Sequence, residues 1–411
     1  MSSPQNAAEA PLDLSKYRSV PKLLIAVGGV IALLGLIFSR QQLGYSWLLA
    51  FMFFLSFGLG ALFLVILNHL FDAMWILPFR RFVEHIACLL PLMFFLFIPI
   101  MILAPLVPIY SWMDPAHAKD HALVTKQAFL NLPMWYGRIV LLFAIWWWLT
   151  SNLRKWSLKQ DQTGAAECTI KMRWYACIGI VLFALTLTTA AIDWMKSLEY
   201  QWFSTMYGVY YFAESVWTSL ITFYVIGVIL KRLGPLRHVA RPGSFHDMGV
   251  LFFAFTVFYA YIHFSQYFLI WNAALPEETF WYIQRETGSW WAVGMIIIFG
   301  HFVIPFLAIL RIDAKLNLAV MVPLCLWAWL CHFFDMSYNI MPVIHPDGFK
   351  LHVLDLACLA VIGGILAEAF IRSFQRHPPY PQRDPRIAET MGVYIPPASE
   401  KRPATAHTGA K

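Results

Sequence analysis

Ten long apolar segments limit the fold of this chain more than any other feature of its sequence. A bilayer core about 30 Å thick requires about 20 apolar residues per helix. Hydrophobic residues make up 60% of the chain and charged residues only 13%, a balance that excludes an ordinary soluble protein. We therefore predict an all-α, polytopic membrane protein with ten transmembrane helices, at about 22–39, 46–67, 86–110, 133–150, 174–192, 206–230, 248–271, 289–310, 316–334 and 353–371.

Prolines and polar tails set the expected organisation around these helices. The third segment carries prolines at 91, 99, 105 and 108, so we expect it to be kinked or to end irregularly. The first twenty residues lack the features of a cleaved signal peptide, so the first apolar segment is expected to be retained. We predict a tail at 1–21, a transmembrane domain at 22–371 and a Pro-rich, extended or disordered tail at 372–411. Helices 2 to 5 and 6 to 9 are candidates for two four-helix bundles, with the other two helices as a peripheral pair.

The basic residues predict the orientation of the chain in the membrane. Ten spans place every second loop on one side, and 23 of the 30 Lys and Arg residues then fall on the side of the termini. Six lie in the other loops, and Arg138 lies within the fourth span. Because basic loops stay in the cytoplasm, both termini are predicted to be cytoplasmic. The net charge of +7 thus reflects topology, and we expect no nucleic-acid partner.

Four of the five loops on the opposite, outer side are longer and rich in Trp and Tyr. These residue types favour the membrane–water boundary, so each loop taken alone fits an aromatic belt. Together they predict a docking surface for another protein. The loops are MDPAHAKDHALVTKQAFLNL, DWMKSLEYQWFS, NAALPEETFWYIQRETG and DMSYNIMPVIHPDGFKLH.

Polar side chains recur at helical spacing on three consecutive spans around 190–220. Ionisable groups inside a membrane are costly and usually functional, and residues three or four apart share a helix face. The resulting candidates for a proton path are Asp193 and Lys196 on span 5, Tyr211, Glu214 and Thr218 on span 6, and Tyr259 and His263 on span 7.

Depth estimates suggest which of these residues could meet. At 1.5 Å per residue, Glu214 and His263 both lie about 12 Å below the outer surface. Arg138 lies at a shallower depth, whereas His301 is expected near the midplane. The sequence therefore describes a polar path from the outside that stops about halfway. Glu214 either transfers protons or contacts ligand, or it joins two helices through tyrosines.

Three further groups of polar residues leave two interpretations open. Asp193, Lys196 and Glu199 form either the path entrance or an exposed ion-pair cluster of little energetic value. An inner-boundary cluster is either functional or a set of snorkelling side chains; it comprises His69, Asp72, Glu84 and His85. An outer-end group on spans 9 and 10 is either surface or an access site; it comprises His332, Asp335, His345, His352 and Asp355.

The cysteines and histidines indicate no redox centre in this chain. Its six cysteines include no CxxC, no CxxCH and no four-cysteine array. A bis-histidine haem needs facing histidines at matched depth, and the one plausible pair, His263 and His301, differs in depth. We therefore expect no metal and no cofactor to be bound by this chain alone.

The segment AIDWMKSLEYQWFSTMYGVYYFAES, with ten spans, inside termini and this length, resembles the ActF-type membrane subunit of alternative complex III, a bacterial quinol:electron acceptor oxidoreductase. That subunit and its sister ActC belong to the NrfD/PsrC-like group. The resemblance covers roughly residues 20 to 375. It carries no catalytic signature, so no residue is transferred as a quinol ligand.

The resemblance implies location and partners. It implies a cofactor-free subunit of two four-helix bundles in the bacterial cytoplasmic (inner) membrane. Its partners would be a pentahaem cytochrome with haem c, an iron–sulfur protein with its clusters, an ActC-like sister and small membrane subunits. A terminal oxidase and lipids are further candidates. In this family the quinol site near a cluster is associated with ActC, whereas ActF-type chains are discussed as carrying a proton path or a structural role.

Three functions follow as hypotheses. The leading one is a redox-complex subunit in a respiratory chain, without catalytic activity alone, that provides a periplasm-facing proton half-channel and scaffolding. The second is a quinol-binding catalytic subunit in which Glu214 or His263 accepts protons. The third is a secondary transporter, against which no matched pair of short, interrupted spans is found.

Overall fold

The computed structural model describes residues 12–392, and within them ten helices are long and apolar enough to cross a membrane. The protein is thus an all-α, multi-pass membrane protein, as predicted. The membrane-crossing helices are α1 (Ser19–Phe38), α2 (Arg40–Phe71), α3 with α4 (Arg80–Ala87 and Leu90–Leu106), α6 (Leu132–Thr163), α7 (Ala166–Trp194), α8 (Tyr207–Leu233), α9 (Pro242–Ala273), α11 with η6 and α12 (Trp290–Ile296, Ile297–Val303 and Ile304–Ala308), α13 (Leu318–Ile340) and α14 (Val353–Phe374). The short elements are α5 (His121–Lys126), α10 (Pro276–Glu286), α15 (Ile387–Thr390) and the 3₁₀ turns η1 (Ser15–Arg18), η2 (Met74–Ile76), η3 (Ser111–Met113), η4 (Pro115–His117), η5 (Lys196–Glu199), η7 (Asp313–Leu316) and η8 (Met341–Val343).

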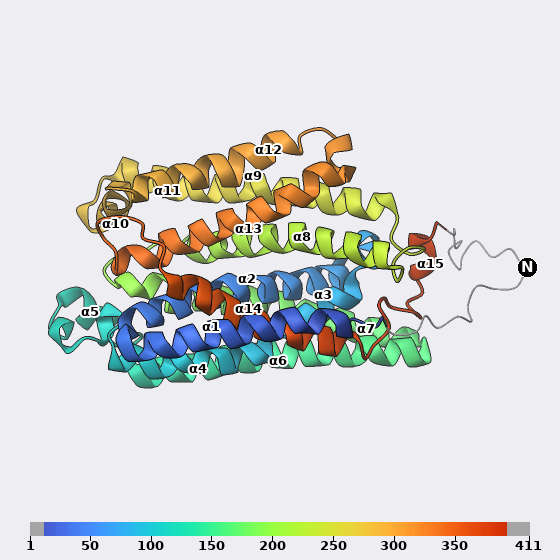
Figure 1. The fold of residues 1–411 in the computed structure, drawn as a ribbon, viewed down its shortest axis with the longest axis horizontal. Coiled ribbons are helices and arrows are strands. Elements are labelled where there is room, and N and C mark those ends of the chain that lie inside the picture. Colours follow the sequence, from blue (N-terminus) through green and yellow to red (C-terminus); the bar gives the residue numbers. More distant parts are fainter. Residues whose placement is uncertain (1–11, 393–411) are drawn as a thin grey trace, which may run out of the picture.

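The helices form two bundles and a peripheral pair. The first bundle is a ring of α2, α3–α4, α6 and α7, and the second is a ring of α8, α9, α11–η6–α12 and α13. Helices α2 and α8 pack against each other and join the two rings, while α1 packs along α14 on the outside of α2. In Figure 1 the second bundle occupies the upper half and the first bundle the lower half.

The two ends of the molecule differ. One end, called here the long-loop end, carries the long connections with α5 and α10, whereas the other, the tail end, carries α15 and both described ends of the chain (Figure 1). The long connections thus gather at one end, as the sequence predicts. Which end faces the cytoplasm stays a prediction.

Proline explains the irregular third span. The helix is interrupted at Cys88 and Leu89, just before Pro91, because proline has no backbone N–H to bond the carbonyl four residues earlier and its ring clashes with that carbonyl. Helix α4 ends at Leu106, two residues before Pro108, and the chain continues as 3₁₀ turns. The prediction of an irregular end to this span is confirmed.

The C-terminal segment corrects the predicted organisation. Helix α14 continues to Phe374, and the chain from Gln375 to Gly392 folds back across the tail end, where Asp384 is almost completely buried. Over its described part this segment is therefore held by the bundle and is not a free tail. The remainder of the predicted tails, at 1–11 and 393–411, lies outside the described residues.

Candidate functional site

Glu214 lies at the centre of the most buried polar cluster of the second bundle. It is completely buried about two turns into α8, and its two carboxylate oxygens contact different histidines. Oε1 lies 2.5 Å from Nδ1 of His332 on α13, and Oε2 contacts Nε2 of His301. The Thr218 hydroxyl donates to Oε1 at 3.3 Å. Helix α8, the turn η6 and helix α13 therefore bring one carboxyl and two imidazoles together at one buried point.

The hydrogen bonds around His332 locate a shared proton. Its Nε2 lies 2.9 Å from the Ser56 hydroxyl, which donates its own hydrogen to the Phe53 carbonyl at 2.6 Å. Nε2 also lies 3.2 Å from that carbonyl, so Nε2 must carry a hydrogen. Nδ1 and the Glu214 carboxyl are then left to share one proton. This proton can pass between the two groups over a single hydrogen bond.

His301 is held rigidly by aromatic rings. It lies in η6, a π-helical turn, an irregularity often found at functional sites. Its ring stacks on Trp217 at a centroid distance of 3.7 Å and on Tyr259 at 3.6 Å. Trp217 is fixed in turn by a hydrogen bond from its indole Nε1 to Thr256 at 2.8 Å. The orientation of His301 toward Glu214 is therefore set by packing.

A second buried acid, Asp335, lies one helical turn from His332. The hydroxyls of Tyr210 and Tyr259 both donate to its Oδ1, the latter at 2.9 Å. Asn339 donates to the Tyr210 hydroxyl at 3.1 Å and accepts a hydrogen bond from Tyr207 at 2.9 Å. Asp335 Oδ2 is buried and has no hydrogen-bond partner within the described part of the chain. We call Glu214, His301, His332, Asp335, Tyr210 and Tyr259 the Glu214 cluster.

Arg285 links the Glu214 cluster to the long-loop end. This residue of α10 is completely buried, and its guanidinium lies 3.6 Å from the centre of the Trp281 ring. The guanidinium donates hydrogen bonds to the carbonyl oxygens of Tyr338 at 2.8 Å and Asn339 at 3.2 Å. It also forms an ion pair with Glu199 at 2.9 Å. A chain of polar contacts thus runs from Glu199 through Arg285 and Asn339 to Asp335.

A cavity of about 930 Å³ borders the Glu214 cluster. Its walls come from α9, α10, α11 and η6, with Tyr338 from α13, and they are largely aromatic and aliphatic. Their polar members include Tyr259, His263, Arg285 and Glu286. Lining residues such as Tyr261 and Phe264 also lie on the exposed outer face of α9, so the cavity opens toward the lipid region. Nδ1 of His263 is buried without a partner among the described residues.

Arg138 and Asp193 are placed together, but away from Glu214. The guanidinium of Arg138 forms a two-pronged contact with the buried Asp193 carboxylate, at 3.1 and 2.6 Å. Arg138 also donates to the Phe129 carbonyl at 2.7 Å. This pair joins α6 to α7 inside the first bundle, and it makes no contact with the Glu214 cluster. It is a structural link between two helices at the long-loop end.

The predicted ion-pair cluster of Asp193, Lys196 and Glu199 is wrong. Asp193 pairs with Arg138 and Glu199 with Arg285, while Lys196 makes no ion pair within residues 12–392. Lys196 lies beyond the end of α7, where burial and the nearby charge of Lys126 lower its pKa to about 8. The three residues are close in sequence, but their side chains point to different helices.

Tyr211 also lies outside the cluster. Its hydroxyl donates to the Met52 carbonyl on α2 at 2.8 Å, so it joins the two bundles. The adjacent Tyr210, which the predicted path omits, contacts Asp335. A shift of one residue along a helix turns a side chain by about 100°, which is enough to exchange their roles.

The predicted outer-end group divides into two parts. His332 and Asp335 are completely buried in the bundle, so their assignment to the surface or an access site is wrong. The reason is that α13 continues to Ile340, six residues beyond the predicted end. The other members do lie at the long-loop end: the His345 ring contacts Gln42 at 2.9 Å, Asp355 accepts a hydrogen bond from Ser46 at 2.5 Å, and His352 caps α14.

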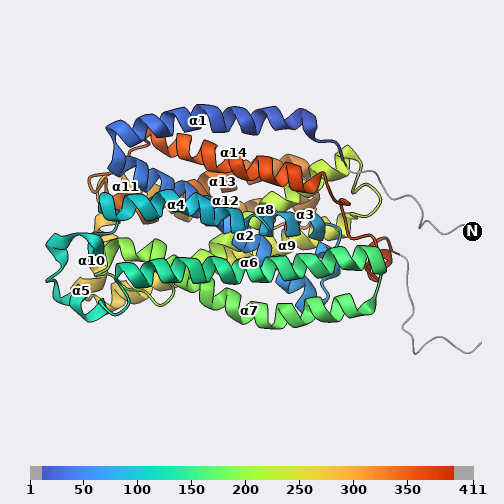
Figure 2. The ribbon, with the colours of Figure 1, turned by 90° about the horizontal axis from the view of Figure 1, so that it is seen from below.

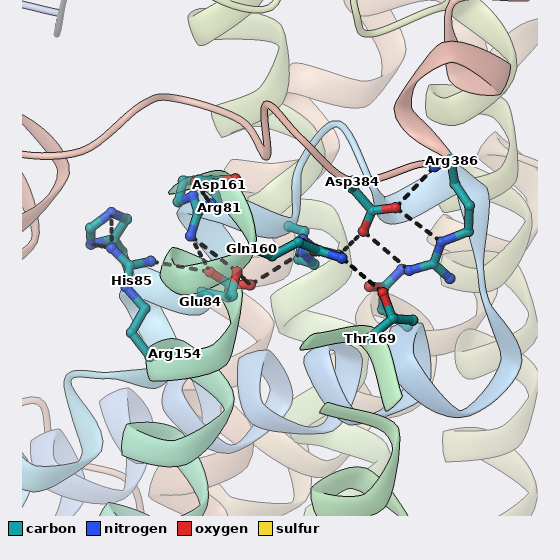
Figure 3. A network of polar contacts seen from close by, with 12 residues as sticks. Arg81, Glu84, His85, Arg154, Gln160, Asp161, Thr169, Asp384 and Arg386 are labelled. Atoms are coloured by element: carbon teal, nitrogen blue, oxygen red, sulfur yellow. Dashed lines mark hydrogen bonds and ion pairs between the residues drawn. The ribbon is translucent and has the colours of Figure 1, made fainter. Parts of the chain in front are cut away.

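The inner-boundary residues belong to a buried charge network at the tail end, shown in Figure 3. Glu84 is almost completely buried and contacts three arginines: Arg80 at 3.2 Å, Arg81 at 2.9 Å and Arg154 at 3.2 Å. Ser157 donates to the same carboxylate at 2.7 Å. Snorkelling therefore does not describe Glu84. We call this set, with the partners described next, the Glu84 network.

The C-terminal segment completes the Glu84 network. Asp384 forms an ion pair with Arg80 at 2.6 Å and a second with Arg386 at 3.1 Å. Burial would raise the pKa of the Asp384 carboxyl, but the charges of Arg80 and Arg386 outweigh burial and hold that pKa well below 3.8. Asp161 contacts Arg81 and accepts a hydrogen bond from the Gln382 backbone at 3.0 Å.

The remaining inner-boundary residues have separate roles. His85 accepts a hydrogen bond from Arg154 at 2.8 Å and contacts the Ser373 hydroxyl at 2.8 Å. Asp72, which ends α2 with a positive φ of 52°, pairs with Arg173 at 2.6 Å and with Arg386 at 2.5 Å. His69 is buried, and neither ring nitrogen has a partner within the described residues.

Comparison with known proteins gives no family for this chain: no protein-family model matches it, and no curated protein matches it either. Within the described residues, no group of three or more His, Cys, Asp and Glu side chains is arranged to hold a metal ion. The absence of a bound cofactor and the identity of the partners stay predictions, and the geometry of the Glu214 cluster carries the functional argument.

Proposed function

We propose that this chain is an integral membrane subunit of a quinol:electron acceptor oxidoreductase complex of the alternative complex III type, in which the Glu214 cluster forms a proton half-channel. The long-loop end would face the periplasm of a bacterial cytoplasmic membrane and bind the redox subunits. The chain would carry no catalytic activity alone. This assignment to a complex rests on the sequence resemblance and the basic loops, and the proton role rests on the cluster.

The single observation that carries the proton role is the contact of the Glu214 carboxyl with two imidazoles in a fully buried position. A carboxylic acid and an imidazole that share a proton are suited to accept and release it. Ionisable groups within a span mark proton relays more often than they serve packing.

The route toward the long-loop end is supported by the polar contacts beyond the cluster. Asp335, Tyr210 and Asn339 are joined by hydrogen bonds, and Asn339 reaches Arg285. Between Asp335 and Glu214 the link is the stacking of Tyr259 on His301. A water molecule bridging Asp335 Oδ2 and the imidazole of His301, whose Nδ1 also has no partner in the described chain, would complete the relay.

Replacing Glu214 in the assembled complex tests the proton role. Glu214→Gln preserves the size of the side chain but removes its proton. We expect quinol oxidation to proceed with fewer protons released on the long-loop side per electron, measured in proteoliposomes with a pH-sensitive dye. Asp355→Asn is the matched control, because it neutralises another buried carboxyl outside the cluster. Unchanged proton release in Glu214→Gln would exclude the role.

The assignment to a complex has its own test. A tagged copy of the chain, extracted from its native membrane in mild detergent, should co-purify with haem c absorbance and an iron–sulfur electron paramagnetic resonance signal. Recovery of the intact chain with neither signal would contradict the assignment while leaving the chemistry of the cluster open to other proton-coupled functions.

The cavity beside the cluster favours quinol binding as a second candidate function. A lipid-soluble ring compound fits its size and its aromatic walls, and the unpartnered Nδ1 of His263 offers a hydrogen bond for a ring oxygen. A quinol oxidised there would pass two electrons to an iron–sulfur cluster of the proposed partner subunit and release two protons. Within the chain, His263 and Tyr259 would orient the ring oxygen, Asp335 would receive one proton, and the Glu214 carboxyl with its histidines would receive the other.

Quinone binding by the purified chain distinguishes the two functions. Quenching of tryptophan fluorescence by a short-chain quinone should titrate to saturation if the cavity binds it, and His263→Leu should weaken the binding about 10-fold. His246→Leu, which removes a half-exposed histidine near the tail-end start of α9, is the control. Non-saturable quenching would leave only the proton half-channel.

A further inference from the structure

A crevice runs along the outside of the molecule between the peripheral pair and the first bundle. Helix α4 packs on α2 and α6, whereas α1 packs mainly on α14 and α2. The view in Figure 2 shows α1 and α14 along one side of the molecule, with α4 next to them. Between these three helices lie two hollows, of about 500 and 420 Å³. We call them together the α1–α4 groove.

The two hollows follow one another along the same three helices. The first is lined by Ile25, Leu92 and Ile365 and lies nearer the tail end. The second continues through Leu33 and Leu36 on α1, with Ile102 on α4 and Val361 on α14. From Ile25 to Leu36 the groove extends over eleven helical residues, or about 16 Å. That length equals about half of the 30 Å bilayer core, which is one leaflet.

The mouth of the groove at the tail end is positively charged. Arg372 and Arg376 line it, and both are exposed. Glu368 is its only acid, and that carboxylate is shared by Arg18 at 3.0 Å and by Nε of Arg372 at 2.7 Å. The outer nitrogens of Arg372 and the guanidinium of Arg376 have no partner within residues 12–392. They remain available for an anion.

The imidazole of His377 completes the mouth. Its Nδ1 donates to the Ser373 carbonyl at 3.0 Å, which leaves Nε2 directed elsewhere. Burial lowers the pKa of His377 below 6.5, so the ring is neutral near pH 7. The charge of the mouth therefore comes from arginines, which stay protonated at any physiological pH.

Two adjacent glycines of α1, Gly28 and Gly29, mark the boundary between the face that packs on α14 and the groove. A side-chain carbon at Gly28 would lie 2.7 Å from the Ala357 carbonyl of α14, so glycine is needed there for close helix packing. At the next residue, Gly29, such a carbon would meet nothing within 4 Å. Gly29 lines the apolar hollow. The groove is thus open where the helix contact ends.

We propose that the α1–α4 groove binds one anionic phospholipid, with its phosphate at Arg372 and Arg376 and an acyl chain along Gly29 and Leu33. An arginine-lined mouth above an apolar channel one leaflet deep matches the two parts of such a lipid. Each arginine near an anionic headgroup contributes about a fivefold gain in binding. The lipid joins the peripheral pair to the first bundle through the space that α1 and α4 leave between them.

Native mass spectrometry of the full chain, purified and incubated with phosphatidylglycerol or phosphatidylcholine, tests this proposal. We expect one phosphatidylglycerol to be retained at collision energies that remove phosphatidylcholine. The double variant Arg372→Gln and Arg376→Gln should weaken retention about 30-fold. Arg311→Gln is the matched control, because this arginine is exposed at the tail end and lies far from the groove in sequence and fold.

A second variant tests the acyl-chain part of the site independently of charge. Gly29→Leu places a side chain in the apolar hollow, and its first carbon meets no protein atom within 4 Å, so the chain should fold normally but lose the retained lipid. Equal retention of both lipids, or unchanged retention in the double variant or in Gly29→Leu, would overturn the proposal. Protection against heat by inorganic phosphate equal to that by phosphatidylglycerol would assign the mouth to free phosphate. A partner's helix occupying the groove in the intact complex would exclude the lipid.

Discussion

The two bundles each bury a glutamate, and the partners of these acids make them chemically different. Glu84 in the first bundle contacts three arginines, whose charge is fixed at any physiological pH. Glu214 in the second bundle contacts two histidines, whose ring nitrogens can donate or accept a hydrogen. Burial is the same at both sites, so burial alone does not indicate proton chemistry. The identity of the partner decides it.

The surroundings of the two acids strengthen this contrast. The Glu84 network is enclosed by α3, α6 and the C-terminal segment, with ion pairs on every side (Figure 3). The Glu214 cluster borders a large cavity and retains unpaired buried atoms, including Oδ2 of Asp335 and Nδ1 of His301. Within the described residues the buried atoms of the Glu84 network that lack a hydrogen-bond partner, Nε of Arg80 and Nε of Arg81, are donors only, whereas Asp335 Oδ2 is an acceptor and His301 Nδ1 can be a donor or an acceptor.

The largest effect is expected from Glu84→Gln. This change leaves Arg154 without an acid among the described residues, whereas Arg80 keeps Asp384 and Arg81 keeps Asp161. An uncompensated buried charge costs about 3–5 kcal/mol of stability. Thermal unfolding in detergent, followed by circular dichroism, should show a large fall in the unfolding temperature. A fall no larger than that of Asp355→Asn would mean that the charges of the Glu84 network are better solvated than its burial indicates.

Asp384→Asn should have a smaller effect, of about 1–3 kcal/mol, because Arg80 retains Glu84 as a partner. This effect depends on pH, because the pKa of Asp384 is lowered in the fold. The carboxylate stabilises the fold above pH 3.8, and this stabilisation is lost as the pH falls further. The variant should therefore lose less stability than the wild type on acidification. Limited proteolysis should also cleave 375–392 faster, and equal cleavage rates would contradict the contact.

Glu214→Gln should cost only about 1 kcal/mol. The amide can still hydrogen-bond to His301 and His332, and both rings can become neutral, so no buried charge is left alone. The same substitution type thus has opposite consequences in the two bundles: stability is lost at Glu84, and proton transfer is lost at Glu214. Infrared difference spectra between two pH values should lack one carboxyl band in this variant. A stability loss as large as that of Glu84→Gln would mean that Glu214, like Glu84, serves to stabilise the fold.

The smallest effect is expected at Lys196, which lies outside both networks. Because burial lowers its pKa to about 8, its charged form is disfavoured in the fold, and this penalty is fully present below about pH 8. The penalty declines as the pH rises toward the ordinary lysine pKa of 10.5. Lys196→Met should therefore stabilise the protein by about 0.5 kcal/mol at pH 7 and by less at pH 10. A gain that is constant with pH would point to packing instead.

The helices could be predicted from the sequence because apolar length is a property of each segment alone. All ten predicted spans correspond to observed helices, and even the interruption near Pro91 follows from a local rule. The gathering of the long loops at one end follows from the alternation of the spans, because every second loop lies on the same side. The pairing of α1 with α14 was expected only because these two helices were left over from the two four-helix bundles. No local sequence pattern specifies it.

The site could be predicted only in part because contacts between helices depend on their rotation and exact ends. Glu214, Thr218, Tyr259 and His301 do meet, although the depth estimate placed His301 nearer the midplane than Glu214. The cluster residues of α13 were available in the sequence, since 332, 335 and 339 share one helix face at steps of three and four. His332 was placed at the outer end of its span, and positions 335 and 339 fell in the predicted loop, because the predicted span ended at 334 and the helix continues to Ile340.

Arg285 was missed for a different reason. Arg285 was counted among the basic residues of the outer loops, and its sequence neighbours, Glu277, Glu278 and Glu286, suggest an exposed helix. Its burial depends on Trp281 and on carbonyl groups of α13, which lie more than fifty residues away in the chain. No sequence pattern within α10 indicates these carbonyl partners on α13.

The C-terminal segment touches both bundles at the tail end, and this sets an order of events during synthesis. Asp384 pairs with Arg80 of the first bundle, and the Met391 carbonyl accepts a hydrogen bond from Arg241 at the start of α9. These contacts involve nearly the last residues of the chain that the structure describes, so they form only after all ten helices have left the ribosome. A chain released before position 384 carries Arg80 without its second acid and lacks this brace. The membrane domain thereby gains this brace only after the segment that follows α14 has been made.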